Sequence, residues 1–435
     1  MMRRFLSLLA ASASLLAPLT SPAASYEWAN GAADHDFGNF NNWNDATSNH
    51  PTTFSGHSFY INLAGANWAE ISSSPDASFN TATRLRMGIL NGQSGELRVS
   101  GGTTLLQSGE LQIGQAGTAV LTMTGGTFSS TGSYTTIGQS AGSNGTLNIT
   151  GGTFNADRIT VSNVADTTAA LNISGGALNI NLSDPTPAST SGSLRMNSGD
   201  ATIHISGTAV VTCEFLITGN IDGGVVGNGL LTMSGGTLNV IGSPIPAPDT
   251  PATLTFPEGG AVAFEGGVWN VKGDETATIA AAIAAGRFHH SQGNTLIQYV
   301  YNSMTDTTVV NLRAPTPLEA WRIAYFGSAD DSGDGANDAD TELDGIKNLI
   351  EYGFGLDPTM ASLSNLPAPV VGPTTATYSF TEPSGVAGIT YGMKTSTNLI
   401  DWDPVTDTGS AGAHVFEVPI GPNGNAFVIF SVTED

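Results

Sequence analysis

The chain has 435 residues, of which 54 are Gly and 11% are charged, and its formal net charge is −24. Such an acidic surface repels phosphate groups, so this balance argues against nucleic acid and anionic membrane surfaces as partners. The single cysteine, Cys213, excludes an intramolecular disulfide and is expected to be a buried free thiol on a strand.

The N-terminus has the three parts of a secretory signal peptide, predicted here over residues 1–25. Arg3 and Arg4 form a short basic region, residues 5–19 are apolar and uncharged, and small residues occupy 23–25, where cleavage is expected. The apolar run is too short for a membrane span, and a buried N-terminal helix is the less favoured alternative. Cleavage would take the net charge from −24 to −26, and no membrane span is expected in the mature chain. The predicted location is therefore secreted, extracellular or at the cell surface.

An octet recurs along the chain at steps of 24 to 32 residues. Its copies are LRVSGGTT (97–104), LTMTGGTF (121–128), LNITGGTF (147–154), LNISGGAL (171–178), IHISGTAV (203–210), LTMSGGTL (231–238) and VAFEGGVW (262–269). A second motif, such as LQIGQAG at 111–117, precedes most copies. Propeller blades usually need about 40 residues or more, so the short step favours a solenoid.

Period-two alternation within each octet defines two inward columns. The first column is Leu97, Leu121, Leu147, Leu171, Ile203, Leu231 and Val262. The second column is Val99, Met123, Ile149, Ile173, Ile205, Met233 and Phe264. Such columns can stack only if equivalent strands lie in register in a parallel sheet, and the Gly-Gly pair is expected to turn the chain through positive φ angles.

These patterns predict an all-β protein whose main part is a parallel β-helix (solenoid) over residues 81–313, in the right-handed form that is the common one. The Pro-rich segments 183–191 and 243–251 are expected to be loops that leave the stack. Residues 274–288 are expected to be helical or irregular and to help close its C-terminal end.

Residues 26–80 are richer in aromatic side chains and are predicted to form an N-terminal cap. These aromatic residues include Trp28, Phe37, Phe40, Trp43, Trp68 and Phe79. An open sheet end invites association with other strands, so covering it is the favoured use of these rings. A surface platform for sugar is the alternative.

The start YEWANGAADHDFGNFNNWNDATSNHP at 26–51, followed by the LTMTGGTF-type octets, resembles bacterial secreted proteins with autotransporter-associated β-strand repeats. The resemblance covers about residues 26–270. It implies a parallel β-helix exposed at the cell exterior.

The run DTELDGIKNLIE at 340–351 fits the calcium-loop pattern D-x-[DN]-x-[DN]-G-x5-E. Calcium takes six to eight oxygen ligands, and alternate carboxylates in a tight turn can bring several to one point. The predicted ligands are Asp340, Glu342, Asp344, the backbone carbonyl of Ile346, Asn348 through water, and Glu351 on the following helix. Gly345 is expected to permit the bend.

The tail also resembles a recurring C-terminal segment of secreted proteins from Verrucomicrobia-like and Planctomycete-like bacteria, through AWRIAYFG (320–327), DTELDGIKNLIEYGFGLDP (340–358) and STNLIDW (396–402). This resemblance implies a calcium-stabilised helical segment, here residues 314–361, and a small terminal β domain. Thr316-Pro317-Leu318-Glu319 is a capping box that predicts a helix start. Residues 362–375 are predicted to be a linker, and residues 376–435 a small β-sandwich with strands in ATYSFT, GITYGMKTS, HVFEVPI and AFVIFSV.

A second acidic group precedes the loop and consists of Asp330, Asp331, Asp334 and Asp338. A degenerate second calcium site is one interpretation. A solvated acidic linker is the favoured one.

No catalytic residues are predicted. The outward column between the two inward ones is Arg98, Thr122, Asn148, Asn172, His204, Thr232 and Ala263, which lacks the paired carboxylates of a hydrolase. A structural or adhesive extracellular protein with bound Ca²⁺ is therefore the first hypothesis, ahead of a carbohydrate-binding protein and then of a polysaccharide-degrading enzyme. Extracellular polysaccharide or cell-envelope components are the expected partners.

Overall fold

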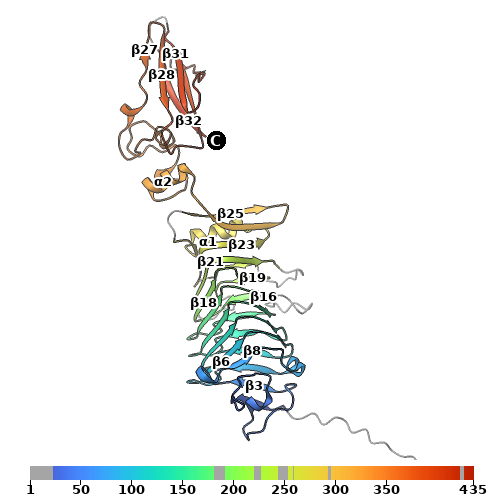
Figure 1. Ribbon diagram of the computed structural model, residues 1–435. Helices are drawn as coiled ribbons and strands as arrows, with labels where there is room; N and C mark the ends of the chain where they lie inside the picture. The colour runs from blue at the N-terminus through green and yellow to red at the C-terminus, as the bar shows by residue number, and fades with distance from the viewer. Residues whose placement is uncertain are drawn as a thin grey trace, which may run out of the picture. The chain divides into compact units, whose positions relative to one another are not determined.

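A computed structural model describes residues 23–180, 192–219, 227–242, 253–257, 259–291, 295–421 and 426–435. The chain forms two compact units, the first reaching Leu312 and the second beginning at Arg313 (Figure 1). Residues 1–22, which include most of the predicted signal peptide, lie outside the described residues, as do the Pro-rich segments 183–191 and 243–251. What the sequence predicts for these three segments therefore stays a prediction.

The first unit is a β-solenoid, as predicted, because equivalent short strands of successive coils pair in parallel and in register. One sheet contains, in spatial order, β2 (Trp43–Asn44), β1 (Ser25–Trp28), β3 (Ser58–Ile61), β5 (Arg84–Met87), β8 (Glu110–Ile113), β11 (Thr135–Ile137), β14 (Ile159–Val161), β17 (Ser193–Met196), β20 (Phe215–Ile217) and β22 (Leu254–Thr255). Within this sheet the β1–β2 pair is antiparallel.

The second sheet has two stripes of parallel strands. The first stripe is β4 (Ala69–Ile71), β6 (Ser94–Val99), β9 (Thr118–Met123), β12 (Asn144–Ile149), β15 (Thr168–Ile173) and β18 (Asp200–Ile205). The second stripe is β7 (Thr103–Leu106), β10 (Thr127–Ser130), β13 (Thr153–Ala156), β16 (Ala177–Ile180) and β19 (Val210–Cys213). Two long strands, β21 (Asn228–Val240) and β23 (Gly260–Lys272), run through both stripes and join them into one sheet.

Both predicted inward columns are confirmed as core. Leu97, Leu121 and Leu147 are direct register partners along the first stripe, and the pairing continues to Val262 on β23. Every member of both columns is buried. The core continues under the second stripe, where Phe128 and Phe154 stack with ring centroids 5.6 Å apart. Cys213 is buried there too, as predicted, and burial raises the pKa of its thiol to about 12.

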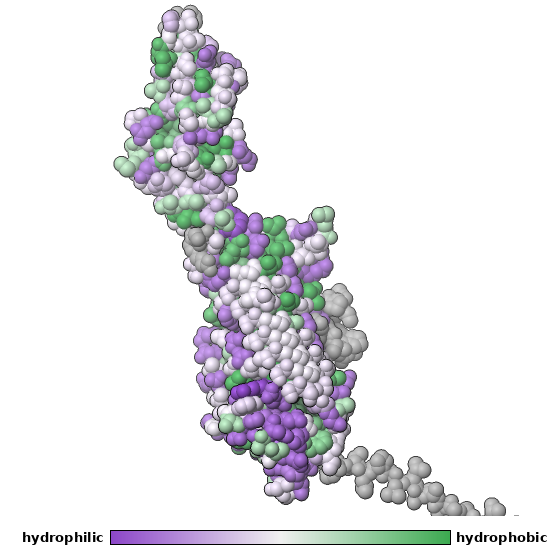
Figure 2. All heavy atoms as spheres, in the orientation of Figure 1, coloured by the Kyte–Doolittle hydropathy of each residue, from purple (hydrophilic) through white to green (hydrophobic). Residues whose placement is uncertain are grey.

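The outward side chains are mostly small and polar, and some of them form hydrogen-bonded ladders. The Asn172 amide donates to Asn148 Oδ1 at 2.9 Å, and the Asn179 amide donates to Asn155 Oδ1 at 3.0 Å. Figure 2 shows a broad pale band of intermediate hydropathy across the middle coils.

The two glycines of the octet at 121–128 have different roles. Gly126 has a φ of +73°, so it turns the chain as the sequence predicts. Gly125 has no such angle, but a Cβ added there would lie 2.6 Å from the carbonyl oxygen of Ser100 in the preceding coil. The first glycine is therefore required by the close approach of successive coils.

The aromatic residues of 26–80 pack inward at the N-terminal end of the solenoid. Trp28 is 2% exposed and Trp43 is fully buried, and their rings meet edge to face at 5.2 Å. Trp68 is covered on its two faces by the His35 ring and by the Arg98 guanidinium. These contacts favour the cap over a sugar platform. The segment also holds the 3-10 turns η1 (Phe40–Asn42), η2 (Gly65–Asn67) and η3 (Ala77–Thr81).

The C-terminal end of the solenoid carries helix α1 (Thr276–Ala284), within the segment predicted to be helical or irregular. After it come β24 (Phe288–His289), β25 (Leu296–Asn302) and β26 (Thr307–Arg313). Strand β26 pairs antiparallel with the second half of β23, so a β25–β26 hairpin follows the last parallel strand.

The second unit starts with helix α2 (Pro317–Phe326), whose capping box between Thr316 and Glu319 is confirmed. It continues through η4 (Gly333–Gly335), α3 (Asn348–Gly353) and η5 (Leu363–Asn365). Two three-stranded antiparallel sheets follow, made of β27 (Val370–Val371), β28 (Thr375–Thr381) and β31 (Ala413–Pro419), and of β30 (Asp403–Val405), β29 (Ile389–Ser396) and β32 (Phe427–Glu434). Ala376 and Phe416 of the first sheet share a core with Met393 of the second.

The inward column gives a stability prediction. Leu147→Ala removes a fully buried side chain, and we expect the solenoid to lose about 2–5 kcal/mol of unfolding free energy. Thr146→Ala, one position away on the outward side, should cost less than about 1 kcal/mol. Chemical denaturation followed by circular dichroism would compare the two variants, and equal losses would contradict the assigned register.

Candidate calcium centre

The predicted calcium loop lies between η4 and α3, in the second unit. Asp340, Glu342 and Asp344 are half-buried, and each offers a carboxylate oxygen such that the three lie within 4.8 Å of one another. The structure thus brings together three of the predicted ligands at one point.

Hydrogen bonds within the loop hold its backbone in a tight turn. The Asp340 carboxylate accepts the amide N–H groups of Asp344 at 3.1 Å and of Gly345 at 2.9 Å, and Asp344 Oδ1 accepts the N–H of Ile346 at 2.9 Å. Gly345 has a φ of +94°, as the predicted bend requires, and Leu343 also has a positive φ of +59°. A non-glycine residue in this region costs of order 1–3 kcal/mol, so the surrounding contacts must maintain the turn.

Glu351 closes the group from helix α3. Its side chain is fully buried, and one of its oxygens accepts the Ser362 hydroxyl at 2.8 Å. Its other oxygen and both oxygens of Glu342 are buried without any hydrogen-bond donor. Burial raises the pKa of Glu351 to about 7, helped by a hydrogen bond that protonated Glu351 makes with Glu342 and by the charges of Glu342 and Asp344.

The two remaining predicted ligands flank the start of α3. Asn348 is buried and donates its amide to the carbonyl oxygens of Asp334 at 2.7 Å and Ala336 at 2.9 Å, while its own Oδ1 has no donor. Ile346 uses its N–H inside the loop, and its carbonyl stays a predicted ligand. Lys347 is exposed.

This donor set fits a hard cation. A buried acceptor oxygen without a donor is costly, and several ionised carboxylates at one point repel one another. None of the ion pairs among the described residues gives Asp340, Glu342, Asp344 or Glu351 a basic partner. Calcium would supply the missing charge to carboxylate and amide oxygens, which are the ligands it prefers.

Ser362 is a supporting residue that the sequence did not identify. Its backbone N–H donates to Asp344 Oδ2 at 2.5 Å and its hydroxyl donates to Glu351, so one residue orients two predicted ligands. It lies at the start of the segment predicted to be a linker, and the loop pattern ends before it. The contacts of Ser362 depend on how the chain folds and not on spacing within the loop pattern. The sequence therefore gives no signal for them.

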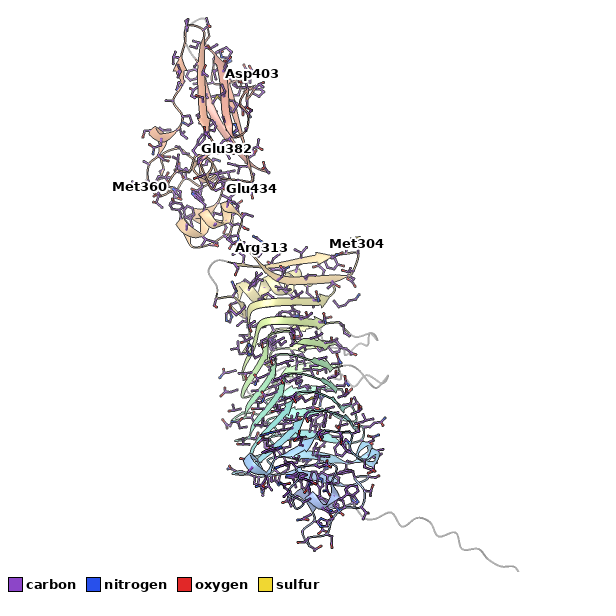
Figure 3. All side chains as sticks on the ribbon, in the orientation of Figure 1. Met304, Arg313, Met360, Glu382, Asp403 and Glu434 are labelled. Atoms are coloured by element: carbon purple, nitrogen blue, oxygen red, sulfur yellow. The ribbon has the colours of Figure 1, made fainter. Side chains whose placement is uncertain are left out.

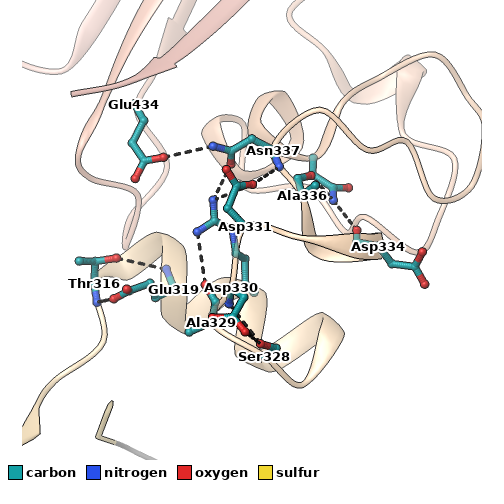
Figure 4. A network of polar contacts seen from close by, with 12 residues as sticks. Thr316, Glu319, Ser328, Ala329, Asp330, Asp331, Asp334, Ala336, Asn337 and Glu434 are labelled. Atoms are coloured by element: carbon teal, nitrogen blue, oxygen red, sulfur yellow. Dashed lines mark hydrogen bonds and ion pairs between the residues drawn. The ribbon is translucent and has the colours of Figure 1, made fainter. Parts of the chain in front are cut away.

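Two of the upstream acids have other partners, because Asp330 accepts the Ser328 hydroxyl at 3.0 Å and Asp331 belongs to a polar network (Figure 4). Asp331 accepts the N–H of Asn337 at 2.6 Å and pairs with the buried Arg322 at 3.5 Å. The Asn337 side chain in turn donates to Glu434 on β32 at 3.1 Å. These contacts favour a structural polar network over a second cation site.

Helix α3 connects the loop to the terminal β-sandwich. The Tyr352 hydroxyl donates to the carbonyl of Ala387 at 2.9 Å and accepts the N–H of the same residue at 3.0 Å. Phe354, which follows the helix, packs against Phe380 and Phe430 with ring centroids 4.9 and 5.3 Å away. Ordering the loop would therefore also fix the helix against the sandwich.

Comparison with protein-family models, with curated proteins and with solved structures finds no significant match for this chain. Among the described residues, none of the helices combines the length and the apolar character needed to cross a bilayer.

The raised pKa of Glu351 predicts opposite effects of pH on the metal-free and calcium-bound forms. In EDTA the fold binds the Glu351 proton more tightly than the unfolded chain does. The second unit should thus lose stability as the pH rises from about 4.5 to about 7. Because calcium competes with the same proton, its affinity should fall as the pH is lowered below about 7.

Melting curves at a series of pH values, with EDTA or with calcium, would measure both effects. Glu351→Gln removes the titrating group and should flatten the dependence in EDTA. An unchanged slope in that variant would assign the dependence to another group.

Proposed function

We propose that this chain is a secreted or cell-surface structural protein with an adhesive role, in which Ca²⁺ stabilises the C-terminal unit. The solenoid provides a stiff, regularly spaced surface, and the calcium loop orders the segment that leads to the sandwich. The supporting observation is the convergence of the Asp340, Glu342 and Asp344 carboxylates, together with the buried oxygens of Glu342 and Glu351 that lack donors.

The chemistry of the chain suits an extracellular setting. The predicted signal peptide motivates the location. Extracellular calcium-binding modules work with dissociation constants of about 0.1–1 mM, so a loop of modest affinity would suffice there.

The alternative function, extracellular carbohydrate binding or polysaccharide degradation, depends on a surface of the solenoid and not on this loop.

Calcium titration by calorimetry on the chain without residues 1–25 tests the proposal. We expect one binding event that is lost in an Asp340→Ala, Asp344→Ala double variant. Calcium at 100 times its dissociation constant should stabilise the second unit by about 2.7 kcal/mol.

Asp403→Ala, Glu417→Ala is the matched control, because it removes two exposed acids of the same unit and so changes the net charge equally. It should bind calcium like the unmodified chain. Equal binding by both double variants would mean diffuse attraction of cations by the acidic surface and would contradict a defined site.

A further inference from the structure

A groove of about 590 Å³ lies near the C-terminal end of the solenoid. Its floor comes from strands β19, β21 and β23, and one wall comes from the β25–β26 hairpin. The volume is within the range of about 300–1,000 Å³ usual for small-molecule sites. Figure 3 labels Met304 at the tip of this hairpin, where its side chain is 93% exposed.

The floor of the groove is a ladder of polar side chains. Thr212, Asn239 and Asn270 are register partners on successive strands. The Asn270 amide donates to Asn239 Oδ1 at 2.9 Å, and the Asn239 amide donates to Thr212 Oγ1 at 3.5 Å. An Asn amide has two N–H donors and two acceptor lone pairs, so this ladder leaves a donor on each Asn for a ligand.

The distance between rungs of the ladder sets the length that each repeating unit of a matching ligand should have. Neighbouring strands lie about 4.8 Å apart, so equivalent amides recur at this interval along the groove. One sugar ring of an extended polysaccharide has a similar length. Consecutive rings could therefore meet equivalent hydrogen-bonding groups.

The hairpin wall is fixed before any ligand binds. Lys272 of β23 pairs with Asp306 in the hairpin turn at 3.1 Å, and the Tyr301 hydroxyl donates to the same Asp306 carboxylate at 2.9 Å. The Thr308 hydroxyl donates to the Gly273 carbonyl at 2.7 Å. A preformed wall lowers the entropic cost of binding.

The charge and polarity of the groove favour an uncharged ligand. Lys272 is the one charged residue of the described lining, and Asp306 neutralises it. Ile241, which is 45% exposed, and Val309 add apolar surface for the C–H groups of a sugar ring. The strand pairs β19–β21, β21–β23 and β23–β26 already occupy the backbone groups between them, so a peptide could not be added as a strand between those of the floor.

We propose that this groove binds a short stretch of an uncharged polysaccharide through the Thr212–Asn239–Asn270 ladder. The inference deepens the proposed adhesive function by naming a ligand class, and it rests on that function for its biological setting. The groove and the calcium loop belong to different units, so each can be tested without the other.

Calorimetric titration of the chain without residues 1–25 with neutral hexasaccharides of glucose, xylose, mannose and N-acetylglucosamine, each in β-1,4 linkage, tests the groove. Hexagalacturonate serves as the anionic comparison. We expect at least one neutral hexasaccharide to bind, with affinity reduced tenfold or more in Asn270→Ala. Thr305→Trp should reduce it as well, because it places a bulky ring at the groove wall without removing a ladder residue.

Asn172→Ala is the matched control, since it removes an equivalent ladder hydrogen bond on the other stripe, outside the groove. It should bind like the unmodified chain, and circular dichroism should verify the fold of every variant. Absence of binding to any neutral hexasaccharide, preference for hexagalacturonate, or binding unaffected by Asn270→Ala and Thr305→Trp would each overturn the proposal. Repeating the titration in EDTA separates it from the calcium site, because groove binding should not change.

Discussion

The stacking of identical strands at one coil spacing is the constraint on which the solenoid depends. Strand pairs such as β9–β12 and β12–β15 keep Leu121, Leu147 and Leu171 in direct register. A slip of one residue in any coil would turn its inward side chains to solvent. It would also break the hydrogen-bonded ladders of outward side chains. The same constraint brings the turns of neighbouring coils so close that a Cβ at Gly125 would meet the backbone of the preceding coil. The core, the turns and the regular polar surface therefore share one physical origin.

This constraint explains why much of the fold could be predicted from the sequence. A repeated octet indicates the position of the strand, its inward residues and its turn. The stacking of the repeats then determines which strands pair with each other. The role of Gly125 was missed because it depends on the neighbouring coil, whereas the positive φ of Gly126 is a local property. The joining of the two stripes by β21 and β23 was also not predicted, since the octets in those strands resemble the others.

The residues of the candidate calcium site also include some that the sequence predicts and some that it does not. Asp340, Glu342 and Asp344 are close in sequence, and their convergence follows from the loop pattern. Ser362 and the amide contacts of Asn348 join residues distant in sequence, so no spacing rule could indicate them. The groove beside Asn270 was missed for the same reason, because its wall depends on how the β25–β26 hairpin folds against β23.

The two proposals give the units separate tasks: the solenoid presents a ligand surface, and the acidic loop orders the segment attached to the sandwich. The most direct test of the calcium account is a crystal structure of residues 26–435 grown with calcium, with anomalous scattering used to locate the ion. The account predicts one ion bound by Asp340, Glu342, Asp344 and Glu351. Well-ordered density in which the Glu342 and Glu351 carboxyl groups lie within hydrogen-bond distance of each other and no ion lies among these side chains would contradict it.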